Sequence, residues 1–146
     1  MKFVIQRVKK AICRVDGKVT GSIQEGLFVL IGFKSDDDET YFDRSIQKIL
    51  QLRVFEDEEK KMNLSLIDAK KQLLVCSQFT LYADAMKGNR PSFVKSMPKN
   101  LAEKYYDEWI KRMKLQLNSL QTGVFSAEME IELIADGPCT IAMEFQ

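Results

Sequence analysis

The most informative absence in this 146-residue chain is that it contains no histidine. Histidine is the usual general base of serine and cysteine hydrolases and a ligand in the commonest zinc sites, so both arrangements are excluded in their usual form. A hydrolase built from this chain must take its proton acceptor from a carboxylate, a lysine with a lowered pKa or the substrate itself. No carboxylate cluster stands out as a metal site, and we expect neither a metal nor another cofactor.

Cysteine and long apolar runs are also scarce. The three cysteines, Cys13, Cys76 and Cys139, are far apart and form no CxxC pair, which is typical of reduced thiols rather than of a disulfide framework. No window approaches the roughly 18–20 consecutive apolar residues of a membrane span, and the first residues lack the apolar region of a signal peptide. We therefore expect a cytoplasmic protein that does not enter a membrane.

The chain also lacks an excess of charge of either sign, since 22 Lys and Arg face 21 Asp and Glu. This balance argues against a protein that coats nucleic acid through a large basic surface, although a local patch is enough to bind RNA. The length, the hydrophobic fraction of 45% and the lack of repeats or linkers predict one domain over residues 1–146. So short a chain has little room for a deep private site, which favours a site at a subunit interface.

The hydrophobic pattern predicts a β-rich domain of the α+β class, with antiparallel, barrel-like sheets and two main helices alongside. Strands are expected at residues 2–8, 11–15, 18–20, 27–31, 73–77, 128–133 and 141–145. A first helix is expected from an N-cap at Ser35 to about residue 50. A second helix is expected to begin near Pro98. The side chains that it should direct toward the core are those of Leu101, Tyr105, Trp109 and Met113.

A run of polar residues follows directly on the apolar strand at 73–77. Ser77, Gln78 and Thr80 stand where this strand leaves the core. Such groups most often satisfy the backbone at a strand end. The functional alternative is a pocket rim, at which these side chains and nearby backbone N–H groups meet a polar substrate.

Residues 84–99 combine one acid, Asp84, with four basic residues, Lys87, Arg90, Lys95 and Lys99. One interpretation is a solvated loop. The other is a flexible loop beside a pocket, well suited to binding phosphates. Phe93 within it either stacks on a base or belongs to the core.

The sequence Asp136-Gly137-Pro138-Cys139-Thr140 separates the last two predicted strands. Gly-Pro is typical of a tight turn. It is also the setting in which a cis peptide bond costs least, and a fixed cis bond would aim two successive carbonyls in the same direction.

Three of these segments together resemble the D-aminoacyl-tRNA deacylase family. They are Ser77-Gln78-Phe79-Thr80-Leu81-Tyr82, Asn89-Arg90-Pro91-Ser92-Phe93 and Asp136-Gly137-Pro138-Cys139-Thr140. Further likeness at residues 5–8, 55–58, 62–65 and 122–125 extends the resemblance over essentially the whole chain. It implies a homodimer whose subunits have an α+β, β-barrel-like fold. The activity that it implies is hydrolysis of the ester between a D-amino acid, or glycine, and the terminal ribose of tRNA. L-aminoacyl-tRNA would be spared.

The resemblance also implies roles for individual residues. The residues lining the catalytic pocket would be Ser77, Gln78, Phe79 and Thr80. A chirality-selecting loop, which reaches into the partner's site, would contain Gly137, Pro138 and Thr140. Arg7 would hold this loop in place.

The remaining implied contacts are with the tRNA. Phe125 and Met129 would receive the terminal adenine. From the composition of the basic loop, Lys87, Arg90 and Lys95 are the expected contacts to tRNA phosphates. This chain has Cys139 where the family more often has valine, and Ser126 and Glu128 where glycine and aspartate are usual. The last two departures bear on the details of adenine contact rather than on the activity.

The missing histidine fits substrate-assisted hydrolysis, in which the 2′-hydroxyl of the terminal ribose helps water to attack the ester. Backbone N–H groups near Phe79 and Thr80 would stabilise the oxyanion, whereas a nucleophilic Thr80 finds no activating group in the sequence. Two alternatives remain open at this stage. One is a non-catalytic nucleic-acid-binding protein of the same fold, and the other is a hydrolase of small esters unrelated to tRNA.

Overall fold

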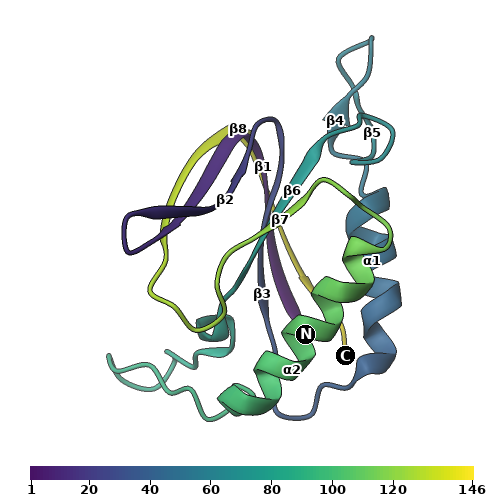
Figure 1. Cartoon of the computed structure of the whole chain (residues 1–146). Helices are drawn as coiled ribbons and strands as arrows, with labels where there is room; N and C mark the ends of the chain where they lie inside the picture. Colours follow the sequence, from purple (N-terminus) through teal and green to yellow (C-terminus); the bar gives the residue numbers. More distant parts are fainter.

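A computed structural model describes all 146 residues of the chain (Figure 1). Its strands are β1 (Lys2–Val15), β2 (Lys18–Ile23), β3 (Gly26–Gly32), β4 (Phe55–Glu56), β5 (Met62–Leu64), β6 (Gln72–Ser77), β7 (Leu120–Thr122) and β8 (Glu130–Glu144). Its helices are α1 (Phe42–Gln51) and α2 (Lys99–Lys114), and two short 3₁₀ helices are η1 (Glu39–Tyr41) and η2 (Phe79–Tyr82). Helices α1 and α2 lie together on one side of the main sheet (Figure 1).

Strand β1 organises the sheet because both of its edges are paired along nearly its whole length. On one edge it runs antiparallel to β8, from Lys2 opposite Glu144 to Arg14 opposite Glu130. On the other edge its first half pairs with β3 and its second half with β2. The strands predicted separately at 2–8 and 11–15 are therefore one strand, and β8 likewise joins the two predicted at the end of the chain. Register shifts around Val8 accommodate the irregular Gly-Pro segment within this pairing.

The sheet continues beyond β3 through two parallel pairs, β3–β6 and β6–β7. Their connections run through α1 and α2, since parallel neighbours need a crossover. The sheet then curls until β2 approaches β7. A Cβ built on Gly21 would lie 2.8 Å from the carbonyl oxygen of Thr122, so this approach requires glycine. The predicted barrel-like α+β domain with two helices is confirmed, although the sheet is mixed rather than wholly antiparallel.

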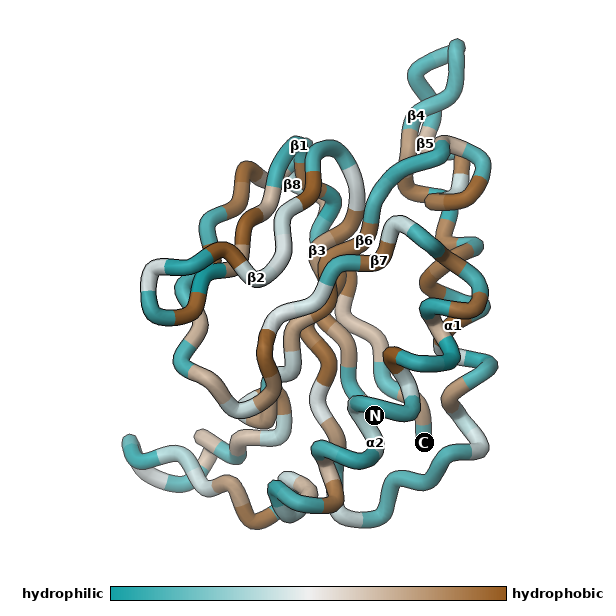
Figure 2. The backbone as a smooth tube through the Cα atoms, in the orientation of Figure 1, coloured by the Kyte–Doolittle hydropathy of each residue, from teal (hydrophilic) through white to brown (hydrophobic).

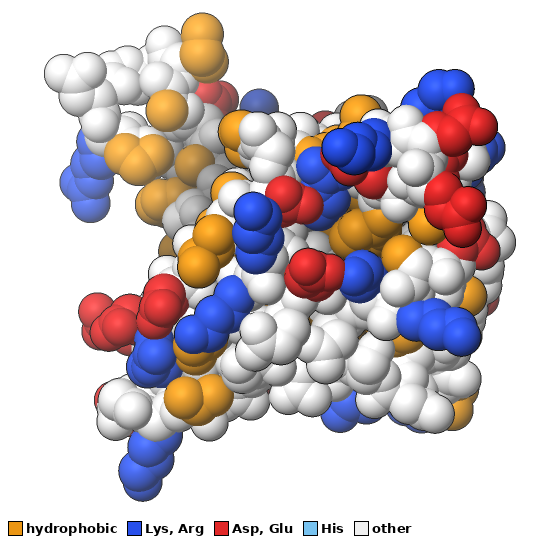
Figure 3. All heavy atoms as spheres, turned by 90° about the horizontal axis from the view of Figure 1, so that it is seen from above, with side chains coloured by type: hydrophobic (Ala, Val, Ile, Leu, Met, Phe, Trp, Pro, Cys, Tyr) orange, Lys and Arg blue, Asp and Glu red, His pale blue; other side chains and the backbone are white.

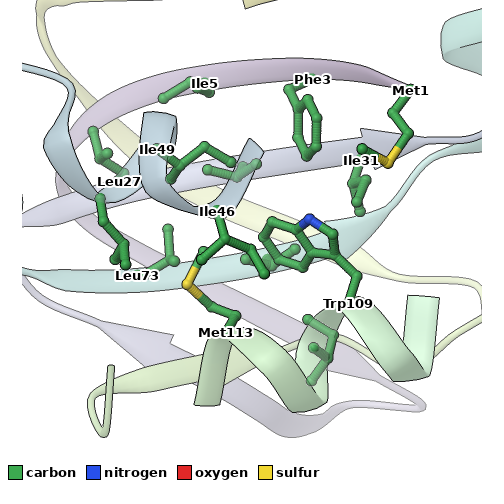
Figure 4. Close-up of a cluster of buried hydrophobic side chains, with 14 of the residues drawn as sticks. Met1, Phe3, Ile5, Leu27, Ile31, Ile46, Ile49, Leu73, Trp109 and Met113 are labelled. Carbon is green, nitrogen blue, oxygen red and sulfur yellow. The ribbon is translucent and has the colours of Figure 1, made fainter. Parts of the chain in front are cut away.

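The main core lies between the sheet and the two helices (Figure 4). Trp109 of α2 is fully buried, and its ring centroid lies 5.8 Å from that of Phe3 on β1. The indole N–H donates to the Ser45 hydroxyl of α1 at 2.9 Å, which leaves no buried donor unpaired. A second, smaller core on the other face of the sheet includes Cys13, Phe28, Leu74 and Cys76.

Both predicted helices are present, with differences at their starts and faces. Ser35 is not the N-cap: Asp38 caps the preceding η1, where its carboxylate accepts from the Thr40 N–H at 2.7 Å, and α1 begins after Tyr41. Helix α2 begins directly after Pro98, as predicted. The prediction that Leu101 faces the core is wrong, because Leu101 is 40% exposed. The helix is rotated so that its buried face consists of Ala102, Tyr106, Trp109, Ile110 and Met113.

The short strands β4 and β5 form a hairpin that the sequence patterns did not predict. It projects from the body of the molecule, and its tip is hydrophilic (Figures 1 and 2). The apolar segments of the chain gather instead in the strands and the inner sides of the helices (Figure 2). Neither helix combines the length and the apolar character needed to cross a membrane.

Two arginines of β1 bridge to β8 in different surroundings. Arg7 is buried: its Nη1 donates to the Val54 carbonyl at 2.5 Å, and its Nε lies 3.0 Å from a carboxylate oxygen of Asp136. Arg14 also forms an ion pair with β8, with its Nη1 3.0 Å from Glu132, but this pair lies at the surface. Arg7 thus ties β1, the segment before β4 and the Gly-Pro region of β8 together.

We predict that Arg7→Met lowers the free energy of unfolding by about 1–3 kcal/mol, the cost of leaving a buried acceptor such as the Val54 carbonyl unpaired. The matched control, Arg14→Met, removes a surface pair on the same two strands and should cost at most about 1 kcal/mol. Urea denaturation of the two variants measures both values. Equal losses would contradict the distinction between the buried and the surface bridge.

Candidate active site

An apolar pocket lies at the edge of the sheet where β3 and β6 end. These strands are parallel neighbours, so their carboxyl ends, at Gly32 and Ser77, meet at the same edge. The pocket has a volume of about 600 Å³, within the range of small-molecule sites, and 12 of its 19 lining residues are hydrophobic. From above, a hollow with hydrophobic side chains along it is visible at the left of the molecule (Figure 3).

The chain turns sharply at the rim of this pocket, from β6 into η2. The Gln78 N–H donates to the Ile31 carbonyl at 2.7 Å, and the Leu81 N–H then closes the first turn on the Gln78 carbonyl. The N–H groups of Phe79 and Thr80 have no acceptor within this short helix, because the first donors of a helix have no intrahelical partner. The predicted pocket rim therefore offers two successive backbone donors.

Ser96 fixes the direction of one of these donors. Its hydroxyl donates to the Phe79 carbonyl at 3.0 Å, and Ser96 itself lines the pocket. The carbonyl and the following N–H of a trans peptide point in opposite directions, so this bond also sets the direction of the Thr80 N–H. Nothing in the sequence around Ser96 signals this contact, because it joins two segments that meet only in the folded chain.

The side chains of the predicted catalytic segment divide into two groups. Ser77, Gln78 and Phe79 line the pocket, whereas Thr80 is exposed and does not. The amide of Gln78 donates to the Thr80 hydroxyl oxygen. An amide cannot accept a proton from that hydroxyl, so Thr80 has no hydrogen-bonded base that would make it a nucleophile.

An aromatic pair stands at the mouth of the pocket. The rings of Phe79 and Phe93 meet edge to face with centroids 5.1 Å apart, and both are unusually exposed for phenylalanine, at 58% and 39%. Phe93 is thus not a core residue, which settles one of the two interpretations left open by the sequence. Exposed aromatic faces and edges of this kind suit a flat ligand.

The predicted adenine-pocket residues, Phe125 and Met129, both line the pocket. The ring of Phe125 packs on that of Tyr106, with centroids 5.6 Å apart. Tyr106 is buried, its hydroxyl donates to the Val75 carbonyl at 3.1 Å, and burial raises its pKa. A neutral, fixed phenol therefore supports the apolar wall on which Phe125 lies.

The basic residues occupy two positions relative to the pocket. Lys87, Arg90 and Lys95 are exposed on the loop between η2 and α2, and none of them lines the pocket. Lys99 does line it, at the N-terminus of α2, where the helix dipole adds partial positive charge.

Asp84 closes this basic loop. Its backbone forms two hydrogen bonds with Ser92, at 2.8 and 2.9 Å, and its carboxylate accepts from the Met86 N–H and lies 3.6 Å from Lys95. The Met86 N–H, and after it the Lys95 ammonium, lower the pKa of Asp84. The loop is therefore a closed hairpin-like turn rather than an open chain.

The Gly137-Pro138 segment lies elsewhere on the chain's surface. Its peptide bond is cis, and neither residue lines the chain's own pocket. A Cβ built on Gly137 would lie 3.0 Å from a guanidinium nitrogen of Arg7, so Arg7 packs directly against this segment. Thr140 lies two residues further along β8, opposite Gln6 of β1.

The matching family model and the curated relatives agree on one family. The family model described as D-Tyr-tRNA(Tyr) deacylase matches residues 4–144. Two relatives named D-aminoacyl-tRNA deacylase, from Kosmotoga olearia and Clostridium tetani, are 46% and 47% identical over 144 residues, which is 99% of this chain and 97% of each relative.

Two solved structures share the fold. One, described as c-Myc DNA Unwinding Element Binding Protein, matches with a TM-score of 0.94 and 36% identity over 100% of this chain and 99% of its own. The other, described as a "probable eukaryotic D-amino acid tRNA deacylase", matches with a TM-score of 0.83 and 17% identity over 97% of both chains, which supports the fold alone. With a family match over nearly its whole length, the chain belongs to the D-Tyr-tRNA(Tyr) deacylase family.

Proposed function

We propose that the protein is a hydrolase that cleaves the ester joining a D-amino acid, or glycine, to the terminal ribose of tRNA, and that it spares L-aminoacyl-tRNA. The observation that carries the proposal is the pair of N–H groups of Phe79 and Thr80, which have no partner within η2, at the rim of an apolar pocket in a chain of this family. The cytosol, where aminoacyl-tRNA is used, is the proposed compartment.

In this proposal the two N–H groups bind the oxyanion that forms when water attacks the ester carbonyl. Such preorganised donors typically contribute about 2.7–4 kcal/mol each to lowering the barrier. Neither of two common proton acceptors is at hand, since the chain has no histidine and burial raises the pKa of the Cys76 thiol that lines the pocket. The neighbouring 2′-hydroxyl of the ribose is therefore assigned the role of assisting the water.

The rest of the tRNA end is assigned to the surfaces around the pocket. Phe125 and Met129 receive the terminal adenine, supported by the buried Tyr106 behind them. Lys99 and the N-terminus of α2 lie close enough to the pocket to bind the nearest phosphate. The more distant phosphates fall to the exposed residues Lys87, Arg90 and Lys95.

We assign the chirality check to the Gly137-Pro138 segment of a partner subunit in a homodimer. This segment does not line the pocket of its own chain, and the outer edge of β8 has no partner strand. Backbone carbonyls fixed near the α-carbon would clash with an L side chain, whereas a D side chain would point away from them. Thr140 would lie on the same loop. A solution mass of a single chain at assay concentrations would contradict this assignment.

The selectivity needed is within reach of such a steric wall. A ten-thousand-fold exclusion of the abundant L-aminoacyl-tRNA corresponds to about 5.5 kcal/mol. Arg7 supplies the rigidity, because it holds the Asp136 carbonyl and packs against Gly137. Glycine has no side chain to clash, and so glycyl-tRNA is also a substrate in this proposal.

The activity is tested by incubating the purified protein with D-tyrosyl-tRNA, glycyl-tRNA and the ethyl ester of D-tyrosine. We expect both aminoacyl-tRNAs to be hydrolysed and the small ester to react far more slowly, because only tRNA offers adenine and phosphates to the pocket rim. Equal rates for the small ester and D-tyrosyl-tRNA would point to a general esterase. Salt-sensitive binding of tRNA without any hydrolysis would point to a non-catalytic nucleic-acid-binding protein.

The role of Thr80 is tested by comparing Thr80→Ala with Thr80→Ser in single-turnover hydrolysis of D-tyrosyl-tRNA. If the Thr80 N–H is the active group, both variants keep it, and we expect each rate to stay within about tenfold of the unchanged protein, well short of the loss seen on removing a catalytic nucleophile. Retention of activity by the serine variant with complete loss in the alanine variant would instead identify the hydroxyl as the nucleophile.

A further inference from the structure

Three sulfur atoms converge at one point in the smaller core, behind the wall of the pocket. They belong to Cys13 on β1, Cys76 on β6 and Met129 just before β8. A Cβ built on Gly123 would lie 3.3 Å from the sulfur of Cys13, 2.8 Å from that of Cys76 and 2.5 Å from that of Met129. Glycine at 123 thus leaves the three sulfurs gathered around its α-carbon, where any side chain would collide with them.

The surroundings of these sulfurs are free of competing groups. Both thiols are unoxidised and buried, and neither has a charged partner. The Cys76 thiol lies beside that of Cys13, so the two can act on one ion together. No three His, Cys, Asp or Glu side chains are grouped to hold a metal. The donors present are therefore two thiols and one thioether.

This donor set selects the type of ion. Thiolate and thioether sulfur favour soft ions such as Cu(I), whereas Mg²⁺ and Ca²⁺ need oxygen ligands. Access comes from the pocket, because Cys76 and Met129 line it. The three segments that supply the sulfurs are each anchored in the sheet or directly beside it, and Gly123 is held by a 3.0 Å hydrogen bond from its N–H to the Val75 carbonyl.

We propose that Cys13, Cys76 and Met129 form a three-coordinate site for a soft monovalent cation, with Cu(I) as its reference ligand. On binding, the ion displaces the two thiol protons to solvent and forms two thiolate bonds and one thioether bond, with no change of oxidation state. Sulfur–metal bonds of about 2.3 Å, as for thiolate on zinc, require only small inward movements of the side chains.

Occupancy of this site has a consequence for the pocket, which rests on the proposed function. Met129 lies both in the sulfur cluster and in the wall assigned to the terminal adenine. A bound ion fixes its thioether on the two cysteines and so restricts how Met129 can adjust to the adenine. Soft-metal binding is therefore coupled to weaker binding of the tRNA end.

The site is tested by titrating the reduced, full-length protein with Cu(I) under anaerobic conditions, in competition with a chromophoric Cu(I) chelator. We expect one ion per chain and a sulfur-only coordination shell in X-ray absorption spectra. Cys13→Ser and Cys76→Ser should each weaken binding on the order of a hundredfold or more, since even outer-shell changes cost 10–100-fold. Met129→Leu, which keeps an apolar side chain, should weaken it less and remove the thioether signal.

The matched control is Cys139→Ser, because Cys139 is a half-buried thiol outside the cluster. It should bind Cu(I) like the unchanged protein. Unchanged binding in both Cys13→Ser and Cys76→Ser, each shown to be folded by circular dichroism, would overturn the site, as would loss of binding in Cys139→Ser alone.

The coupling to activity has a separate readout. One equivalent of Cu(I) should raise the KM for D-tyrosyl-tRNA in the unchanged protein but not in Cys13→Ser, whose substitution lies outside the pocket wall. An unchanged KM at full occupancy would overturn the coupling while the spectroscopic site stands. If D-tyrosyl-tRNA is not a substrate at all, the proposed function fails and the titration still decides the metal site.

Discussion

The pairing of both edges of β1 is the constraint on which the other parts of the molecule depend. Its β8 edge carries the Gly137-Pro138 segment, and its other edge positions β3, whose carboxyl end forms one side of the pocket. Arg7, in the middle of β1, connects these parts because its buried guanidinium contacts both the Asp136 region and the segment before β4. A displacement of β1 would therefore disturb the pocket and the Gly-Pro segment together.

The position of the pocket follows from the mixed character of the sheet. The parallel pair β3–β6 brings two strand ends to one edge, and the crossover from β6 to β7 leaves the start of α2 beside it. The turn from β6 into η2 then exposes two backbone N–H groups at this edge. Fixed backbone donors can stabilise an oxyanion without any titratable side chain. The chain's lack of histidine is therefore compatible with hydrolysis.

The local parts of this arrangement could be predicted from the sequence. Apolar runs identified β3 and β6, and the polar residues after β6 marked the pocket rim, of which Ser77, Gln78 and Phe79 do line the pocket. Phe125 and Met129 were placed there by family resemblance, and the structure brings them to the same pocket. Their assigned roles toward substrate remain predictions.

The parts that the sequence did not predict all depend on contacts between distant segments. Ser96 reaches the Phe79 carbonyl across 17 positions, and Lys99 lines the pocket only because of how α2 docks. The rotation of α2 that exposes Leu101 is set by packing against the sheet, which helical periodicity alone cannot specify. The parallel pairing of β3 with β6 likewise depends on the crossover through α1, and not on any local pattern.

The central claim is that backbone atoms, rather than side chains, select the chirality of the aminoacyl group. The most direct test measures kcat/KM for matched D-tyrosyl-tRNA and L-tyrosyl-tRNA with the purified protein. The account predicts rapid loss of the D ester with the L ester at its spontaneous rate, a ratio on the order of 10⁴, equivalent to about 5.5 kcal/mol. Equal cleavage of the two esters would contradict it, because the Gly137-Pro138 segment would then exclude nothing.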